Sequence, residues 1–324
     1  MKRFMMLIAL IIMGCGGGGG SSGGGGTVVI PPNNNLLPVS RAGLYYSYFG
    51  DCDNAAASSA PPYFSCITET SNQVNMTLDV GFGIAQANDH SQSDIAARHL
   101  VQDQSLGITT SMVGLSEELY SYQNGTSVYI GDAEAIPKLQ AYFTQLRSLG
   151  VLQNIVAFYP IDEPNLNVGT EADVIAANKV VRQVMTQFSE LSNTKLAAIY
   201  APFQYGGWKG ISSYDWVGFD DYSPGNDIFT NGEFDNFEQM LSPSQQIILV
   251  PGGASNTGKI DPTVFYNKAQ TDMRVVAIVA FVYFDLATSS TPILGIRDDG
   301  LAKDYCTIGQ MIKTPGLSES SVKC

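Results

Sequence analysis

Short apolar segments alternate with longer amphipathic stretches along most of this chain. The apolar segments are rich in Val, Ile, Phe and Tyr, a composition typical of strands that are buried on both faces. Eight such segments are present, at residues 42–48, 74–82, 108–115, 155–161, 195–200, 216–220, 246–250 and 275–284.

Helix signals occupy several of the connections between these segments. Thr170 with Asp173 has the pattern of a capping box, and Asp261 before a proline has the pattern of a helix start. Apolar residues recur at helical spacing between 136 and 149, with Pro137 expected in the first turn. Residues 201–215 leave room for only a short helix.

Eight strands separated mainly by helices over about 285 residues predict a single (β/α)8 barrel, the TIM-barrel fold. The alternative is a doubly wound open sheet, which usually has a glycine-rich phosphate loop after its first strand. No such loop follows the first apolar segment, where the sequence reads Tyr-Phe-Gly-Asp-Cys, and no strand precedes the glycine tract near the N-terminus.

The first 36 residues have the features of an export signal and a tether. Lys2 and Arg3 precede an apolar segment at 5–13 that is too short to span a bilayer. The sequence Ile-Met-Gly-Cys15 resembles a bacterial lipobox, which implies a signal peptide at 1–14 and an acylated Cys15. A flexible Gly/Ser/Asn linker at 15–36 would then hold a folded domain, 37–324, away from the lipid surface. The alternative is an ordinary signal peptide with an incidental cysteine.

Charge and export signals narrow the choice of partners. The chain has 17 Lys and Arg against 30 Asp and Glu, a net charge of −13. Nucleic acids and anionic lipids require clustered cations, so neither is an expected partner. We expect an exported monomer that contacts a bacterial membrane, most simply the outer membrane or cell surface, through its lipid anchor alone.

Four cysteines remain after Cys15, an even number that indicates two disulfides in an exported protein. Three pairings are possible, and local pairing closes the shortest loops. We therefore predict the bonds Cys52–Cys66 and Cys306–Cys324. The absence of CxxC spacing argues against a zinc site, and no metal or other cofactor is expected.

Acids and aromatic residues follow several predicted strands, at the end of a barrel where active sites lie. Rim acids and amides can bond to sugar hydroxyls, while rim aromatics can stack on the C–H faces of sugars. The acids that could take part in catalysis are Asp162, Glu163, Asp221 and Asp285. The residues expected to contact the sugar or orient these acids are Tyr159, Asn165, Trp208, Asp220, Tyr222 and Tyr283.

The segment Ile-Val-Ala-Phe-Tyr-Pro-Ile-Asp-Glu-Pro, residues 155–164, is a buried strand that ends in two carboxylates and a proline. It resembles the fourth-strand motif of the retaining barrel glycosidases, the large clan with Asn-Glu-Pro. The resemblance implies that Glu163 is the general acid/base, with Asp162 where the clan has Asn. The segment Trp-Val-Gly-Phe-Asp-Asp-Tyr, residues 216–222, also resembles a sixth strand of such enzymes.

One departure from the clan bears on mechanism. The clan places its nucleophilic Glu after strand seven, whereas residues 246–255 here contain no acid. The second carboxylate could be Asp221, Asp220, Asp285 or Asp162, with Asp221 the first choice. Adjacent Asp-Glu pairs also occur in barrel hexosaminidases, in which the acetamide of the substrate attacks and the Asp steadies it.

The sequence thus predicts a surface-tethered glycoside hydrolase that cleaves a β-linked oligosaccharide or polysaccharide. Its proton donor would be Glu163. The missing acid after strand seven favours an alternative, a non-catalytic glycan-binding lipoprotein on a degenerate barrel.

The lipobox resemblance yields a direct test. We expect the substitution Cys15→Ser to convert a membrane-associated, palmitate-labelled protein into a soluble exported one, because the acylated thiol is lost. Fractionation and labelling of both forms measure this. Labelling that persists in Cys15→Ser would contradict the prediction.

Overall fold

The computed structural model describes residues 43–49, 78–80, 92–202, 206–220, 228–230, 232–253, 261–285, 294–314 and 316–324. Cys15, Cys52, Cys66, Asp221 and Tyr222 lie outside the described residues. The lipid anchor, the tether and the Cys52–Cys66 bond therefore stay predictions.

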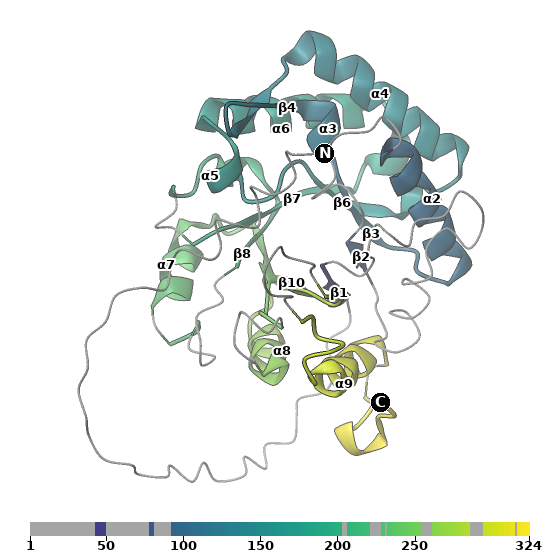
Figure 1. Ribbon diagram of the computed structural model, residues 1–324, viewed down its shortest axis with the longest axis vertical. Coiled ribbons are helices and arrows are strands. Elements are labelled where there is room, and N and C mark those ends of the chain that lie inside the picture. The colour runs from purple at the N-terminus through teal and green to yellow at the C-terminus, as the bar shows by residue number, and fades with distance from the viewer. Residues whose placement is uncertain are drawn as a thin grey trace.

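A curled sheet of parallel strands forms the centre of the fold (Figure 1). Its strands are, in spatial order, β1 (Tyr45–Tyr48), β10 (Val275–Ala280), β9 (Gln246–Leu249), β8 (Trp216–Phe219), β7 (Lys195–Tyr200), β6 (Ile155–Tyr159), β3 (Ser111–Gly114) and β2 (Asp79–Val80). The Leu78 N–H donates to the Tyr46 carbonyl at 3.1 Å, so the two ends of this order meet.

Each strand lies within a segment that the apolar pattern predicts, and the α/β class with a curled parallel sheet is confirmed. The regularity of a full (β/α)8 barrel is not. Seven strands have four to six residues, but β2 has only two, and the connection from β1 to β2 lies outside the described residues.

Helices surround the sheet on its outer side (Figure 1). They are α2 (Gln92–Ser105), α4 (Asp132–Ser148), α6 (Glu171–Met185), α7 (Glu233–Met240), α8 (Pro262–Thr271) and α9 (Ala302–Lys313). Between β7 and β8 the described chain has only the short 3-10 helix η6 (Ile211–Ser213), as the length of that connection predicts. No helix of the described residues is long and apolar enough to cross a membrane.

Local sequence explains where two of these helices begin. The Thr170 hydroxyl oxygen accepts the Asp173 N–H at 3.2 Å at the start of α6, and the Asp261 carboxylate accepts the Thr263 N–H at 2.9 Å at the start of α8. Helix α4 begins earlier than predicted, so Pro137 lies beyond its first turn. Before α4 the chain forms an unpredicted hairpin of β4 (Tyr120–Gln123) and β5 (Thr126–Tyr129).

The core has two layers because successive side chains of a strand point to opposite sides of the sheet. Phe158 belongs to the large outer cluster between strands and helices. Ala157 and Tyr159, its neighbours on β6, belong to a smaller inner cluster with Ile199 and Ile248 of other strands. Tyr159 therefore faces the inside of the sheet, at the end of β6 where Asp162 and Glu163 follow.

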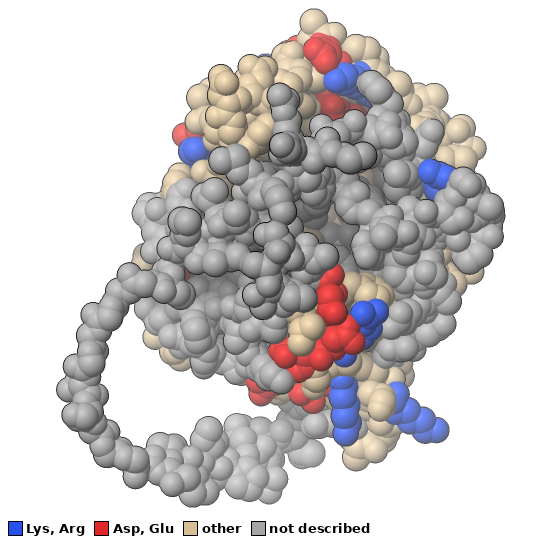
Figure 2. Space-filling view, viewed as in Figure 1, with Lys and Arg blue, Asp and Glu red and all other residues tan. Residues whose placement is uncertain are grey.

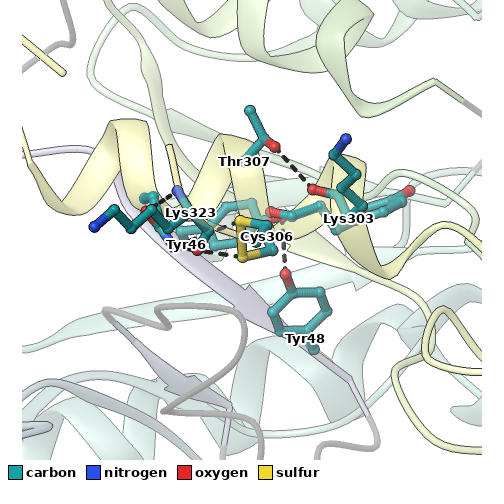
Figure 3. The surroundings of a disulfide bond; sticks show 9 residues. Tyr46, Tyr48, Lys303, Cys306, Thr307 and Lys323 are labelled. Atoms are coloured by element: carbon teal, nitrogen blue, oxygen red, sulfur yellow. Dashed lines mark hydrogen bonds between the residues drawn. A yellow bond between two sulfur atoms is a disulfide. The ribbon is translucent and has the colours of Figure 1, made fainter. Parts of the chain in front are cut away.

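A disulfide fixes the C-terminal segment to α9 (Figure 3). Cys306 and Cys324 are bonded with a Cα–Cα distance of 6.0 Å, which confirms one of the two predicted pairs. The Tyr46 hydroxyl donates to the Tyr305 carbonyl at 2.7 Å, so the same helix is anchored to β1. The face shown in Figure 2 carries a patch of acidic side chains near α9, in keeping with the net charge of −13.

This disulfide closes a loop with a sequence separation of 18. Because the cross-link restricts the unfolded chain, we expect Cys324→Ser to lower the free energy of unfolding by about 3 kcal/mol. Urea denaturation of the wild type and the variant measures the difference, and thiol labelling should show a newly free Cys306. An unchanged urea midpoint would contradict the prediction.

Candidate active site

Three carboxylates and one tyrosine meet at the carboxyl ends of the central strands. Asp162 and Glu163 follow β6, and Asp220 follows β8, with β7 lying between those two strands in the sheet. The Tyr159 hydroxyl donates to Asp162 Oδ1 at 2.7 Å. Asp220 lies close enough to Glu163 to lower its pKa.

The environment raises the pKa of both acids of the Asp-Glu pair. Burial raises the pKa of Glu163 to about 8, with a further contribution from the negative charge of Asp162 and an opposing one from Asp220. Burial raises the pKa of Asp162 to about 6, opposed by hydrogen bonds from the Tyr159 hydroxyl and the Glu163 backbone. Burial and the neighbouring charge therefore favour the protonated form of Glu163 near neutral pH.

The pair is half-buried and still reaches solvent. That intermediate exposure matters because a fully enclosed acid could not meet a substrate, and a fully exposed one would keep its ordinary pKa. Asp220 is similarly half-buried, and its backbone N–H donates to the Tyr200 carbonyl at 3.0 Å. The three acids therefore form a partly open acidic cluster at one end of the sheet.

The backbone of Glu163 is unusual. Its φ of +40° and ψ of 65° place it in the left-handed region, which residues other than glycine rarely adopt. Such a conformation costs on the order of 1–3 kcal/mol and clusters at functional sites. Pro164 begins the short helix α5 (Pro164–Asn167) and disfavours a right-handed helical conformation at the residue before it.

Hydrogen bonds hold this turn in place. The Glu163 N–H donates to the Ile199 carbonyl at 3.1 Å, and the Glu163 carbonyl accepts the N–H groups of Leu166 and Asn167, each at 2.9 Å. The Asn167 side chain donates to the Asp162 carbonyl at 2.8 Å. Asn167 was not among the residues that the sequence singled out, since no spacing or motif distinguishes it.

Two of the residues expected to contact a sugar are buried. The side chain of Asn165 is 2% exposed, and both of its polar atoms bond to the backbone of Ala201. Tyr283 is fully buried, with its ring packed edge-on against Tyr48 and Phe284, so it offers no face to a sugar. Both side chains turn inward because the core and the end of β7 supply better partners than solvent.

Trp208 and Asp285 also have partners of their own. Trp208 is half-buried, with its ring against Tyr200 and Phe237 of the outer core layer. Asp285 accepts the Gly295 N–H at 2.8 Å, which links the residues after β10 to residue 295. Neither arrangement involves the acidic cluster. In the described part of the chain, no group of three or more His, Cys, Asp or Glu is arranged to hold a metal ion.

No family model matches the sequence, and no curated protein matches it. Solved structures do resemble the fold. A fungal endo-β-N-acetylglucosaminidase from glycosyl hydrolase family 18 has a TM-score of 0.51 at 12% identity, covering 86% of this chain and 100% of its own. ScGas2 in complex with compound 8 has a TM-score of 0.51 at 11% identity, covering 87% and 67%.

The β-glucuronidase of Parabacteroides merdae has a TM-score of 0.52 at 8% identity, covering 84% of this chain and 37% of its own. At such low identities the likeness concerns the fold alone. The protein is thus an α/β domain with a curled parallel sheet that resembles the TIM-barrel folds of glycoside hydrolases.

The raised pKa of Glu163 predicts how stability depends on pH. Between the ordinary glutamate pKa of about 4.3 and the folded value near 8, the folded state binds more protons than the unfolded state. The contribution of Glu163 to the free energy of unfolding must therefore fall as pH rises through this window. Glu163→Gln removes the titrating carboxyl group and should therefore weaken the dependence of the free energy of unfolding on pH.

At each pH we compare the free energy of unfolding of Glu163→Gln with that of the wild type. The value for the variant minus the value for the wild type should be at least about 1.4 kcal/mol larger at pH 9 than at pH 5, which corresponds to one pKa unit. Urea denaturation across this range measures it. Glu134→Gln, on the exposed side of α4, serves as the control and should parallel the wild type. A Glu163→Gln curve that also parallels the wild type would sink this prediction.

Proposed function

We propose that the protein is a glycoside hydrolase in which Glu163 protonates the oxygen of the leaving group. The observation that carries the proposal is the position of Glu163: half-buried, beside Asp162, and close to Asp220 at the carboxyl end of the sheet. A proton donor must hold its proton at working pH, and a pKa of about 8 meets that requirement. The glycoside-hydrolase-like fold supports the same reaction class.

Asp220 and Asp162 have different parts in this proposal. Retaining enzymes separate their two carboxyl groups by about 5 Å, and inverting enzymes by more. Asp220 lies beside Glu163 and lowers its pKa, so it suits orientation of the Glu163 carboxyl group better than attack on the sugar. Asp162 loses its proton more readily and is oriented by the Tyr159 hydroxyl. We assign it to stabilise positive charge that develops on the sugar ring.

The substrate class is a β-linked oligosaccharide or polysaccharide, with no cofactor taking part. The acidic surface suits an uncharged polymer better than a polyanion. Acylation of Cys15 and the flexible linker would hold the domain at a bacterial surface where such polymers are met. The rival function, glycan binding without cleavage, rests on the lack of an acid in the segment after β9, residues 250–255.

The test begins with a screen of the purified domain, residues 37–324, against a panel of glycans. On a cleaved substrate with a poor leaving group, Glu163→Gln should lower kcat by about 100- to 10,000-fold, because the proton donor is lost. A dinitrophenyl glycoside needs no protonation to leave, so its bond-breaking step should be affected much less. Asp162→Asn should slow both substrates alike.

Glu134→Gln is the matched control and should retain wild-type rates. Full hydrolysis by Glu163→Gln would show that the acid has been wrongly assigned. If no glycan is cleaved but one is bound, and binding survives Glu163→Gln, the surface-binding function replaces the enzyme.

A further inference from the structure

Asn165 lies two residues after Glu163, and both polar atoms of its side-chain amide bond to the backbone of a single residue, Ala201. Its Nδ2 donates to the Ala201 carbonyl at 2.8 Å, and its Oδ1 accepts the Ala201 N–H at 3.1 Å. Asn165 and Ala201 are both buried. Ala201 is the first residue after β7. The Asn165 side chain therefore bonds to the backbone just beyond the last residue of that strand.

The same strand also binds the backbone of Glu163, through the Ile199 carbonyl at 3.1 Å. The turn at 162–167 is therefore fixed to β7 at two points, one on each side of Pro164. Asn167 adds a third link within the turn, from its side chain to the Asp162 carbonyl. Glu163 has a left-handed backbone between these points. Since that conformation is unfavourable by itself, the links around it must maintain it.

Asn165 is itself supported from behind. Lys209 Nζ donates to the Asn165 carbonyl at 3.3 Å and to the Val168 carbonyl at 3.0 Å. Gly206 approaches the same Asn165 carbonyl so closely that a Cβ atom there would lie 2.5 Å away. The connection after β7 thus packs against Asn165 and leaves it little freedom to shift.

We propose that Asn165 is a positioning residue: by pairing with Ala201 it holds Glu163 in the left-handed conformation in which its carboxyl group meets Asp220. The inference rests on the proposed function, in which Glu163 is the acid. Asn165 has no contact with substrate in this role. It acts through the backbone, and its loss should change the surroundings of Glu163 as well as the stability of the domain.

The experiment must separate positioning from stability alone. The titrating groups that face Glu163 among the described residues are Tyr159 at the end of β6, Asp162 after β6, and Asp220 after β8. Asn165→Ala leaves all three in place. A changed titration of Glu163 in that variant therefore reports a changed position of its carboxyl group relative to them and to solvent.

The probe is the NMR signal of the glutamate side-chain carboxyl carbons in the 13C-labelled full-length protein. The Glu163 signal is identified as the one that is missing from the spectrum of Glu163→Gln. In Asn165→Ala we expect the Glu163 midpoint to fall by about one pH unit or more, because the released side chain gains water and moves away from Asp162. On a cleaved glycan, kcat should fall by about 10- to 100-fold with KM nearly unchanged.

Asn178→Ala is the matched control. Asn178 is a fully buried asparagine on α6, and its Nδ2 donates to the Ser213 hydroxyl at 2.7 Å, away from the acidic cluster. We expect this variant to lose stability yet keep the wild-type Glu163 midpoint. A midpoint in Asn165→Ala that equals the wild type, or that shifts no more than in Asn178→Ala, overturns the proposal.

If Asn165→Ala does not fold, Asn165→Ser, whose hydroxyl can keep at most part of the pairing with Ala201, takes its place. A smaller fall of the Glu163 midpoint supports the proposal, and an unchanged midpoint refutes it. A wild type that cleaves no glycan would count against the proposed function, whereas the titration would still decide whether Asn165 positions Glu163.

Discussion

The left-handed backbone at Glu163 is the constraint on which the arrangement of the site depends. Pro164 disfavours a right-handed helical conformation at the preceding residue, while the Ile199 carbonyl takes up the Glu163 N–H. The four residues 160–163 then carry the chain from β6 into α5, with Glu163 close to Asp220, which follows β8 on the other side of β7. Hydrogen bonds from both sides of the turn offset the conformational cost.

A cluster of acids is electrostatically unfavourable, and here that cost has chemical consequences. Burial and the charge of Asp162 both disfavour the ionised form of Glu163, so the site keeps a proton near neutral pH. Tyr159 directs its hydroxyl to Asp162 and thereby favours ionisation of that acid over its neighbour. Two adjacent carboxyl groups are thus pushed toward different protonation states, which is what acid catalysis with an ionised partner requires.

The rest of the fold holds these groups in position relative to one another. The inner layer of the sheet places Tyr159 toward the interior, and the outer layer packs the helices against the strands. Helix α9 is joined to β1 by the Tyr46–Tyr305 bond and to the C-terminal segment by the Cys306–Cys324 disulfide. A rigid parallel sheet suits a site built from strand ends, because strands that are far apart in sequence must present their last residues within hydrogen-bond reach.

Much of the fold was predictable from the sequence because its signals are local. Buried strands appear as continuous apolar segments, Thr170 and Asp261 cap the helices that follow them, and Cys306 lies close in sequence to its partner Cys324. The Asp-Glu pair after β6 was equally evident. Tertiary structure alone decided that Asp220 meets Glu163, that Asn165 bonds to Ala201 instead of facing outward, and that Tyr283 is buried. These outcomes depend on which strand ends lie side by side and how far each turn is twisted, and a linear pattern of residue types contains neither.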